Sequence, residues 1–182
     1  MLSVHISYPD HSNIDAILIK SGFKKTSSTY ILETLTQKEL AKANLEENSY
    51  NFTITFPNNL SLDEYGQIHK AISFIANHSA ITVDDSNSQL GYLQNGEVAC
   101  ILTNWSDWVH FLEKARHKSM EGQKVKVLNE NGFELGNGIL TEYTIVDSLD
   151  SGFQIEKCTL ITTLGERSFL GPKIKIEPTG EW

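Results

Sequence analysis

The amino-acid sequence predicts an α+β protein of two domains, and three observations carry this prediction. Strand and helix patterns follow one another in the first part of the chain, an amphipathic helix comes next, and short strands with glycine-rich turns fill the remainder. Of the 12 glycines, four lie in residues 1–118 and eight in the remaining 64 residues. We therefore expect a ferredoxin-like α/β sandwich at residues 1–102, a connecting helix at 103–121 and a small SH3-like β-barrel at 122–182.

Alternating apolar and polar residues predict the strands of the first domain. The clearest strands are residues 2–8 and 51–56, in which every second side chain is apolar. The residues between them, such as His5, are expected to point to the opposite face. The other strand patterns are weaker and lie at residues 23–34, at residues 80–85, and on both sides of the hairpin dipeptide Asn95-Gly96.

Three helices are predicted in the first domain. The longest covers residues 61–77, because Ser61 and Glu64 make a capping box and apolar residues recur after it with helical spacing. A shorter helix is expected at residues 13–21. Residues 37–47 contain many strong helix formers, so we expect a third, solvent-exposed helix there.

The connecting helix is predicted from the spacing of its apolar side chains. Trp105, Trp108, Val109 and Leu112 fall at intervals that place them on one stripe of a helix. Asn104 is positioned to cap the N-terminus, and basic residues in the last turn suit the negative end of the helix dipole. We interpret the two tryptophans as packing between the two domains.

Turn residues divide the second domain into strands. Asn131-Gly132 predicts a hairpin, and Gly136 and Gly138 permit a bend or bulge in the strand that follows. Further strands are expected at residues 139–146, 153–161 and 174–176. About five short strands without a helix are typical of a small barrel.

The net charge of −8 argues against a general nucleic-acid-binding function, because an acidic protein repels phosphate backbones. Positive charge is clustered in only three places along the sequence, which are Lys24-Lys25, residues 114–118 and Lys173–Lys175. Acidity of this kind favours a soluble protein, or one whose partner is basic.

The two cysteines and the lack of targeting signals predict a cytoplasmic location. Cys100 and Cys158 stand apart from each other and from any metal-ligand spacing, and each lies in an apolar run, as buried free thiols do. The first residues do not resemble a signal peptide, and no window approaches the roughly 18 uninterrupted apolar residues of a membrane span. We therefore expect a soluble protein in a reducing compartment, without a membrane partner.

The sequence predicts no metal site, no cofactor and no covalent catalysis. The six histidines lack metal-binding spacings, no GxSxG motif is present, and Gly136-Asn137-Gly138 lacks the remainder of a phosphate-binding loop. Asp84-Asp85, at a strand end, could bind a metal or act as an acid/base pair. Adjacent strand residues point to opposite faces, however, so we interpret both as solvated or loop-capping aspartates.

In size, acidity and lack of catalytic motifs, the chain resembles the immunity proteins that bacteria keep against secreted toxins, many of which are basic nucleases. The resemblance implies a non-catalytic protein that neutralises a toxin by direct binding, with an acidic surface that steers the basic partner toward it. The candidate contacts are acidic residues in loops or at element ends, namely Glu46, Glu47, Asp84, Asp85, Asp147 and Asp150.

Two other functions remain open on the sequence alone. The first is a small enzyme with a cleft between the domains, where carboxylates such as Asp84 and Glu166 would have to converge. The second is a regulatory or scaffold protein whose barrel recognises a peptide, with Phe133, Tyr143 or Trp182 as aromatic anchors.

Overall fold

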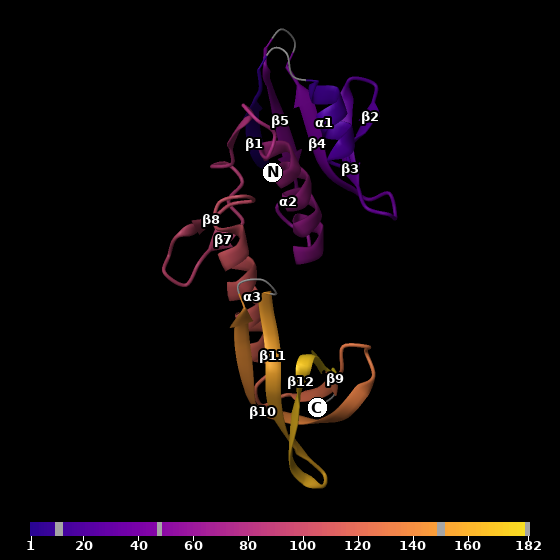
Figure 1. Cartoon of the computed structure of the whole chain (residues 1–182), viewed down its shortest axis with the longest axis vertical. Helices are drawn as coiled ribbons and strands as arrows, with labels where there is room; N and C mark the ends of the chain where they lie inside the picture. The colour runs from indigo at the N-terminus through magenta and orange to yellow at the C-terminus, as the bar shows by residue number, and fades with distance from the viewer. Residues whose placement is uncertain (10–12, 47–48, 149–151, 181–182) are drawn as a thin grey trace. The chain divides into compact units, whose positions relative to one another are not determined.

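The computed structural model describes residues 1–9, 13–46, 49–148 and 152–180, and it is a mixed α+β structure (Figure 1). The described residues contain three helices and sheets whose strand pairs are antiparallel. The chain divides into two compact units, Met1–Trp108 and Val109–Trp182. None of the helices in the described ranges combines the length and the apolar character needed to cross a membrane.

A six-stranded antiparallel sheet forms the centre of the first unit. Its spatial order is β2-β3-β4-β5-β1-β6, so the N-terminal strand lies inside the sheet, between β5 and β6. The strands are β1 (Leu2–Ser7), β2 (Lys24–Thr26), β3 (Thr29–Glu33), β4 (Glu39–Leu45), β5 (Asn51–Phe56) and β6 (Thr82–Asp84).

One face of this sheet is buried by two helices, α1 (Ile14–Lys20) and α2 (Leu62–Ala76) (Figure 1). The alternating apolar residues of β1 and β5 meet in register, with Val4 opposite Ile54 and Ile6 opposite Phe52, and all four are fully buried. Burial of these side chains is the main driving force for the unit, and the polar residues between them are left on the other face.

The expected helix at residues 37–47 is wrong, because this segment forms strand β4. Ala43 of β4 lies opposite Tyr30 of β3 on one side and opposite Ile54 of β5 on the other. Leu40 and Ala43 are fully buried. Helix propensity is worth less than about 1 kcal/mol per residue, so two strand ladders and the burial of the apolar side chains outweigh it.

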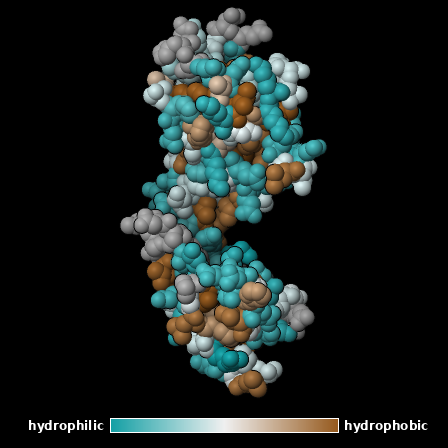
Figure 2. All heavy atoms as spheres, turned by 45° about the vertical axis from the view of Figure 1, so that its right-hand side comes forward, coloured by the Kyte–Doolittle hydropathy of each residue, from teal (hydrophilic) through white to brown (hydrophobic). Residues whose placement is uncertain are grey.

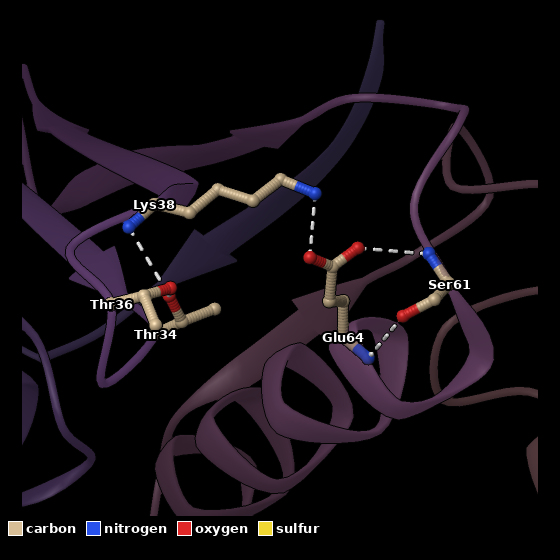
Figure 3. A network of polar contacts seen from close by, with 5 residues as sticks. All are labelled: Thr34, Thr36, Lys38, Ser61 and Glu64. Atoms are coloured by element: carbon tan, nitrogen blue, oxygen red, sulfur yellow. Dashed lines mark hydrogen bonds and ion pairs between the residues drawn. The ribbon is translucent and has the colours of Figure 1, made fainter.

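The capping box that begins α2 is confirmed (Figure 3). The backbone N–H of Glu64 donates to the Ser61 hydroxyl at 3.3 Å, and the N–H of Ser61 donates to the Glu64 carboxylate at 2.9 Å. Lys38, which precedes β4, forms an ion pair with the same carboxylate at 2.5 Å. The lysine and the Ser61 amide together lower the pKa of Glu64.

Helix α3 (Trp105–Ser119) follows a small hairpin of β7 (Gly91–Tyr92) and β8 (Val98–Ala99). Trp105 stacks on the ring of His69 with centroids 4.6 Å apart, and the Trp108 ring meets Tyr65 edge-on at 6.4 Å. These ring contacts lie within the first unit, and the division between the units falls inside α3, after Trp108.

Asn104 lies at the N-cap position of α3, as predicted, but its side chain is used for another contact. Asn104 has a positive φ of 59°, which asparagine tolerates better than most residues. Its side-chain amide donates to the Val98 carbonyl at 3.0 Å, so it ties the helix start to the β7–β8 hairpin. Its backbone carbonyl accepts the Trp108 N–H at 3.0 Å.

Four strands of the second unit pair in a closed ring, in the order β10-β11-β12-β9. Its core includes Met120, which follows α3, together with apolar residues from all four strands. Apolar groups are also exposed among hydrophilic ones on this unit, as Figure 2 shows for one face. The strands are β9 (Lys124–Leu128), β10 (Glu134–Ser148), β11 (Gly152–Thr162) and β12 (Gly165–Pro178).

The two glycines expected at a bend or bulge lie where β10 crosses its neighbours closely. The register of β10 against β9 shifts between Glu134 and Gly136, as a β-bulge produces. A side chain at Gly136 would meet the Phe169 ring at 2.6 Å, and one at Gly138 would meet the Ile161 carbonyl oxygen at 2.4 Å. Gly138 therefore requires glycine for the close approach of a backbone, whereas a β-carbon at Gly136 would require the Phe169 ring to move.

Candidate partner-binding face

The side of the six-stranded sheet that faces away from α1 and α2 is polar and accessible, and we call it the open face. It arises from the same alternation that builds the core, because every second residue of each strand points to it. In its four-strand centre, no member is buried. These members are Ser3, His5, Ser7, Lys42, Asn44, Asn51, Thr53, Thr55, Thr82 and Asp84.

A continuous row of hydrogen-bonding side chains crosses four strands of the open face. Asn44 lies opposite Thr53, Thr53 lies opposite His5, and His5 lies opposite Asp84. The Thr53 hydroxyl and Nδ1 of His5 are 3.0 Å apart and share a hydrogen bond. At about 4.8 Å between strands, the row is about 14 Å long, so the open face presents a broad surface of donors and acceptors.

Asp84 provides a negative charge at the β6 side of the open face. Its carboxylate accepts the Ser86 N–H at 3.0 Å. Hydrogen bonds from Ser86, with His5 nearby, lower the pKa of Asp84, so this exposed carboxylate is ionised near neutral pH.

Glu46 provides a second negative charge, just beyond the end of β4. Its backbone N–H donates to the Asn51 carbonyl at 3.3 Å, and its carboxylate accepts the Ser49 hydroxyl at 3.1 Å. Two strands, β5 and β1, separate β4 from β6 in the sheet. Asp84 is therefore the β6 end of the row, and Glu46 lies two residues past Asn44 at its β4 end; within the described part of the chain neither forms an ion pair.

The lysines near the open face are paired with carboxylates. Lys42 lies 3.1 Å from Glu39, and Lys24 lies 3.0 Å from Glu33. These exposed pairs contribute little to stability, but each cancels a positive charge locally. The charges left without an ionic partner on this face are therefore negative.

The Asp85 carboxylate accepts hydrogen bonds from a loop, in agreement with its interpretation as a loop-capping aspartate. Its carboxylate accepts the backbone N–H groups of Leu102 and Thr103, both at 2.8 Å, and the Thr103 hydroxyl at 2.9 Å. These bonds join the end of β6 to the segment before α3. The structure therefore separates Asp84 and Asp85 into different roles and does not bring them together in one site.

Asp85→Ala should lower the free energy of unfolding by about 2 kcal/mol, because three donors lose a charged acceptor. Urea unfolding followed by circular dichroism measures this loss. Asp84→Ala is the matched control, and its effect should be well below half as large. Equal effects of the two substitutions would contradict the structural role of Asp85.

The remaining predicted contacts are not placed on this face. Glu47 and Asp150 lie outside the described residues. Asp147 belongs to β10, where its backbone lies opposite Phe153, but its side chain is outside the described part. Both Asp147 and Asp150 belong to the second unit.

His69 is a partly buried residue that the sequence did not single out. Its Nδ1–H donates to the Ile101 carbonyl at 2.7 Å, so Nε2 is left to accept the Ser73 hydroxyl at 3.4 Å. Burial lowers the pKa of His69. The neutral ring joins α2 to the segment before α3, which is a structural role.

Stability should fall as the pH drops below about 6.5, because the unfolded His69 then binds a proton more readily than the folded one. The loss continues as the pH falls through the lowered pKa of the folded state. Urea unfolding between about pH 7.5 and about pH 5 tests this, since His69→Gln should have a flatter profile. Parallel profiles for the two proteins would exclude His69 as the cause.

The described residues contain no group of three His, Cys, Asp or Glu side chains that could hold a metal ion. Cys100 and Cys158 are buried and unpaired. Burial raises the pKa of Cys158 to about 11. The pKa of Cys100 is also raised, mainly by burial and to a smaller extent by the negative charge of Asp85. Both thiols are therefore protonated near neutral pH and are poor nucleophiles in this state.

Sequence alternation could have identified His5, Asn44 and Thr53 as solvent-facing, but not as neighbours. The strands that carry them are joined through the order β4-β5-β1-β6, and this order follows from the tertiary structure.

Comparisons of the chain with protein-family models, with curated proteins and with solved structures found no match. The open face is accordingly defined by the geometry of this chain.

Proposed function

We propose that this chain is a non-catalytic protein-binding protein that acts as an immunity or inhibitor protein against a bacterial toxin, and that its open face contacts the partner. The observation that carries the proposal is the row Asn44–Thr53–His5–Asp84, flanked by Glu46, on a broad accessible sheet surface. A broad, accessible array of this kind suits a protein surface better than a small ligand, which favours an enclosed cleft.

Charge supports a basic partner. The chain carries a net charge of −8, and the lysines of the open face are paired while Glu46 and Asp84 are not. Long-range attraction would speed the encounter, and the neutral hydrogen-bonding side chains would then fix the orientation of the partner. The proposal involves neither a nucleic acid nor a membrane, and it requires no cofactor.

We propose a ferredoxin-like sandwich for the first unit, in which β1, β4, β5 and β6 are the four basic strands and β2–β3 is an added hairpin. The order β6-β1-β5-β4 and the positions of α1 and α2 in the chain support this description. The closed ring of four strands supports an SH3-like barrel for the second unit. The two buried free thiols support a cytoplasmic location.

The proposal is tested by mixing the purified chain with a toxin domain encoded beside its gene. Binding measured by calorimetry, together with loss of the toxin's activity at equimolar inhibitor, is the expected result. Thr53→Arg places a long charged side chain at the centre of the open face and should weaken binding at least tenfold through steric and charge conflict. Thr36→Arg, in an exposed turn, is the matched control and should bind normally.

Charge on the open face is tested separately. The double variant Glu46→Gln/Asp84→Asn should slow association and reduce its salt dependence, whereas Glu97→Gln/Glu130→Gln removes two exposed carboxylates elsewhere and should do less. If the toxin domain neither binds nor loses activity, the immunity function is wrong. If it binds equally well to Thr53→Arg, the partner uses another surface.

A further inference from the structure

A cavity of about 600 Å³ lies within the second unit, between the C-terminal half of α3 and strands β11 and β12. Glu113, Arg116 and His117 line it from the helix, and Gln154 lines it from β11. Lys173, Ile174, Lys175, Ile176 and Glu177 line it from β12. Its volume is in the range of small-molecule sites.

The cavity forms where β12 passes from one neighbour to the other. Up to Ile174, which lies opposite Ile155, β12 pairs with β11, and from Lys175 onward it pairs with β9. Lys173, at the change, has a positive φ of 60°, a conformation that costs free energy for a residue with a β-carbon. The ladder between β11 and β12 therefore ends at Ile155 and Ile174, and the cavity opens beside this end.

Two of the three basic clusters of the sequence meet at this cavity. Arg116 comes from the cluster at the end of α3, and Lys173 and Lys175 come from the cluster on β12. The helix dipole accounts for basic residues in the last turn of α3, but it does not account for lysines on a strand that lines the same opening.

The positive charges in the lining exceed the negative ones. Arg116, Lys173 and Lys175 stand against Glu113 and Glu177, and Glu177 lies 3.1 Å from Lys126 in an ion pair. The cavity is therefore locally basic on a chain whose net charge is −8. Guanidinium and ammonium groups of this kind bind carboxylate and phosphate oxygens.

The lining also has an apolar part. Ile155, Ile174 and Ile176 are buried core residues that line the cavity beside the charged side chains. A second, adjoining cavity shares Gln154, Ile155 and Lys173 with the first and adds the exposed Leu170. An apolar surface next to the cations favours a ligand with a carbon body over a bare inorganic ion.

We propose that the second unit binds a small organic oxyanion in this cavity, with Arg116, Lys173 and Lys175 holding a phosphate or carboxylate group and the exposed Leu170 of the adjoining cavity contacting the carbon body. This site is independent of the open face, which lies in the other unit, and its local charge is positive where that of the open face is negative. The proposed function could therefore be wrong while this site is real, and this site could be wrong while the proposed function holds.

The full chain is titrated at low salt with phenyl phosphate, phthalate and inorganic phosphate, and amide NMR shifts report where each probe binds. We expect phenyl phosphate or phthalate to shift the amides of Gln154, Lys173 and Lys175 and to bind more tightly than inorganic phosphate. The comparison of the first two probes decides between a phosphate and a carboxylate ligand. Affinity should decrease as the salt concentration rises.

Three variants make the test specific. Lys173→Gln should weaken binding about tenfold, because one charge-assisted hydrogen bond is lost. Lys114→Gln is the matched control, since Lys114 lies on the same helix as Arg116, is exposed and does not line the cavity. Glu113→Gln removes a negative charge from the lining and should strengthen binding, a change of opposite sign that partial unfolding cannot imitate.

The proposal is overturned if no probe shifts these amides at concentrations up to about 20 mM. This concentration is well above the dissociation constant expected of a specific binding site. It is also overturned if Lys114→Gln weakens binding as much as Lys173→Gln, because the interaction would then be a general attraction to basic residues.

Discussion

Replacing Gly138 with alanine should destabilise the second unit by about 3 kcal/mol or more. The added β-carbon would lie 2.4 Å from the Ile161 carbonyl oxygen and 3.0 Å from its carbon. Both atoms belong to the backbone of β11, and the next residue of β10, Ile139, lies opposite Ile161 in the ladder. The clash can therefore be relieved only by moving β10 away from β11, which breaks strand pairing in the closed ring.

Two other glycines provide a graded control for this prediction. Gly136→Ala meets the ring of Phe169 at 2.6 Å, and a side chain can rotate away more easily than a backbone, so its cost should be intermediate. Gly171→Ala meets only Ile174 at 3.6 Å, an ordinary contact, so its effect should stay below about 1 kcal/mol. Urea unfolding by circular dichroism gives the order, and a Gly138 variant as stable as the Gly171 variant would contradict the steric explanation.

Trp108→Ala should lower the stability of the first unit by about 3–5 kcal/mol, the cost typical of removing a buried aromatic side chain. Trp108 is only 8% exposed. Its ring contacts Tyr65 of α2, and a β-carbon at Gly91 would lie 2.9 Å from its Nε1. The substitution would leave a cavity between α3, α2 and the β7–β8 hairpin.

Trp105→Ala is the comparison for this prediction, because Trp105 is only partly buried and stacks on His69. We expect a smaller loss in urea unfolding followed by circular dichroism, a signal that does not depend on tryptophan fluorescence. If Trp108→Ala removed partner binding while stability stayed intact, the binding surface would have to be moved from the open face to α3.

The periodic elements could be predicted closely from the sequence. The strand expected at residues 51–56 is β5, the capping box begins α2, and the helix expected at 103–121 contains α3. These elements can be recognised from the sequence because alternation and capping involve residues that are near one another in the chain. Residues 37–47 could not be predicted in this way, since the pairing of β4 with β3 and β5 is a contact between distant segments.

The candidate sites likewise depend on contacts between distant segments, which the sequence does not predict. Charge and position were enough to select Glu46 and Asp84 from the sequence, but nothing in the sequence placed the ends of β4 and β6 two strands apart in one sheet. Asp85 cannot be distinguished from Asp84 in the sequence, yet its carboxylate accepts three hydrogen bonds from the loop before α3. The basic clusters that contain Arg116 and Lys173 could be listed separately, and only the path of β12 brings them to one cavity.

The sequence by itself determined the local elements, the acidity and the residues that had to be buried, because these depend on composition and on short-range periodicity. The tertiary structure decided which polar residues became neighbours, which aspartate lies on the open face and where the pairing of β12 with β11 ends. Those outcomes depend on strand order and register, which are set by the summed burial of many side chains from distant parts of the chain. The chemistry proposed for this protein lies on that second level, at the open face and at the opening beside β12.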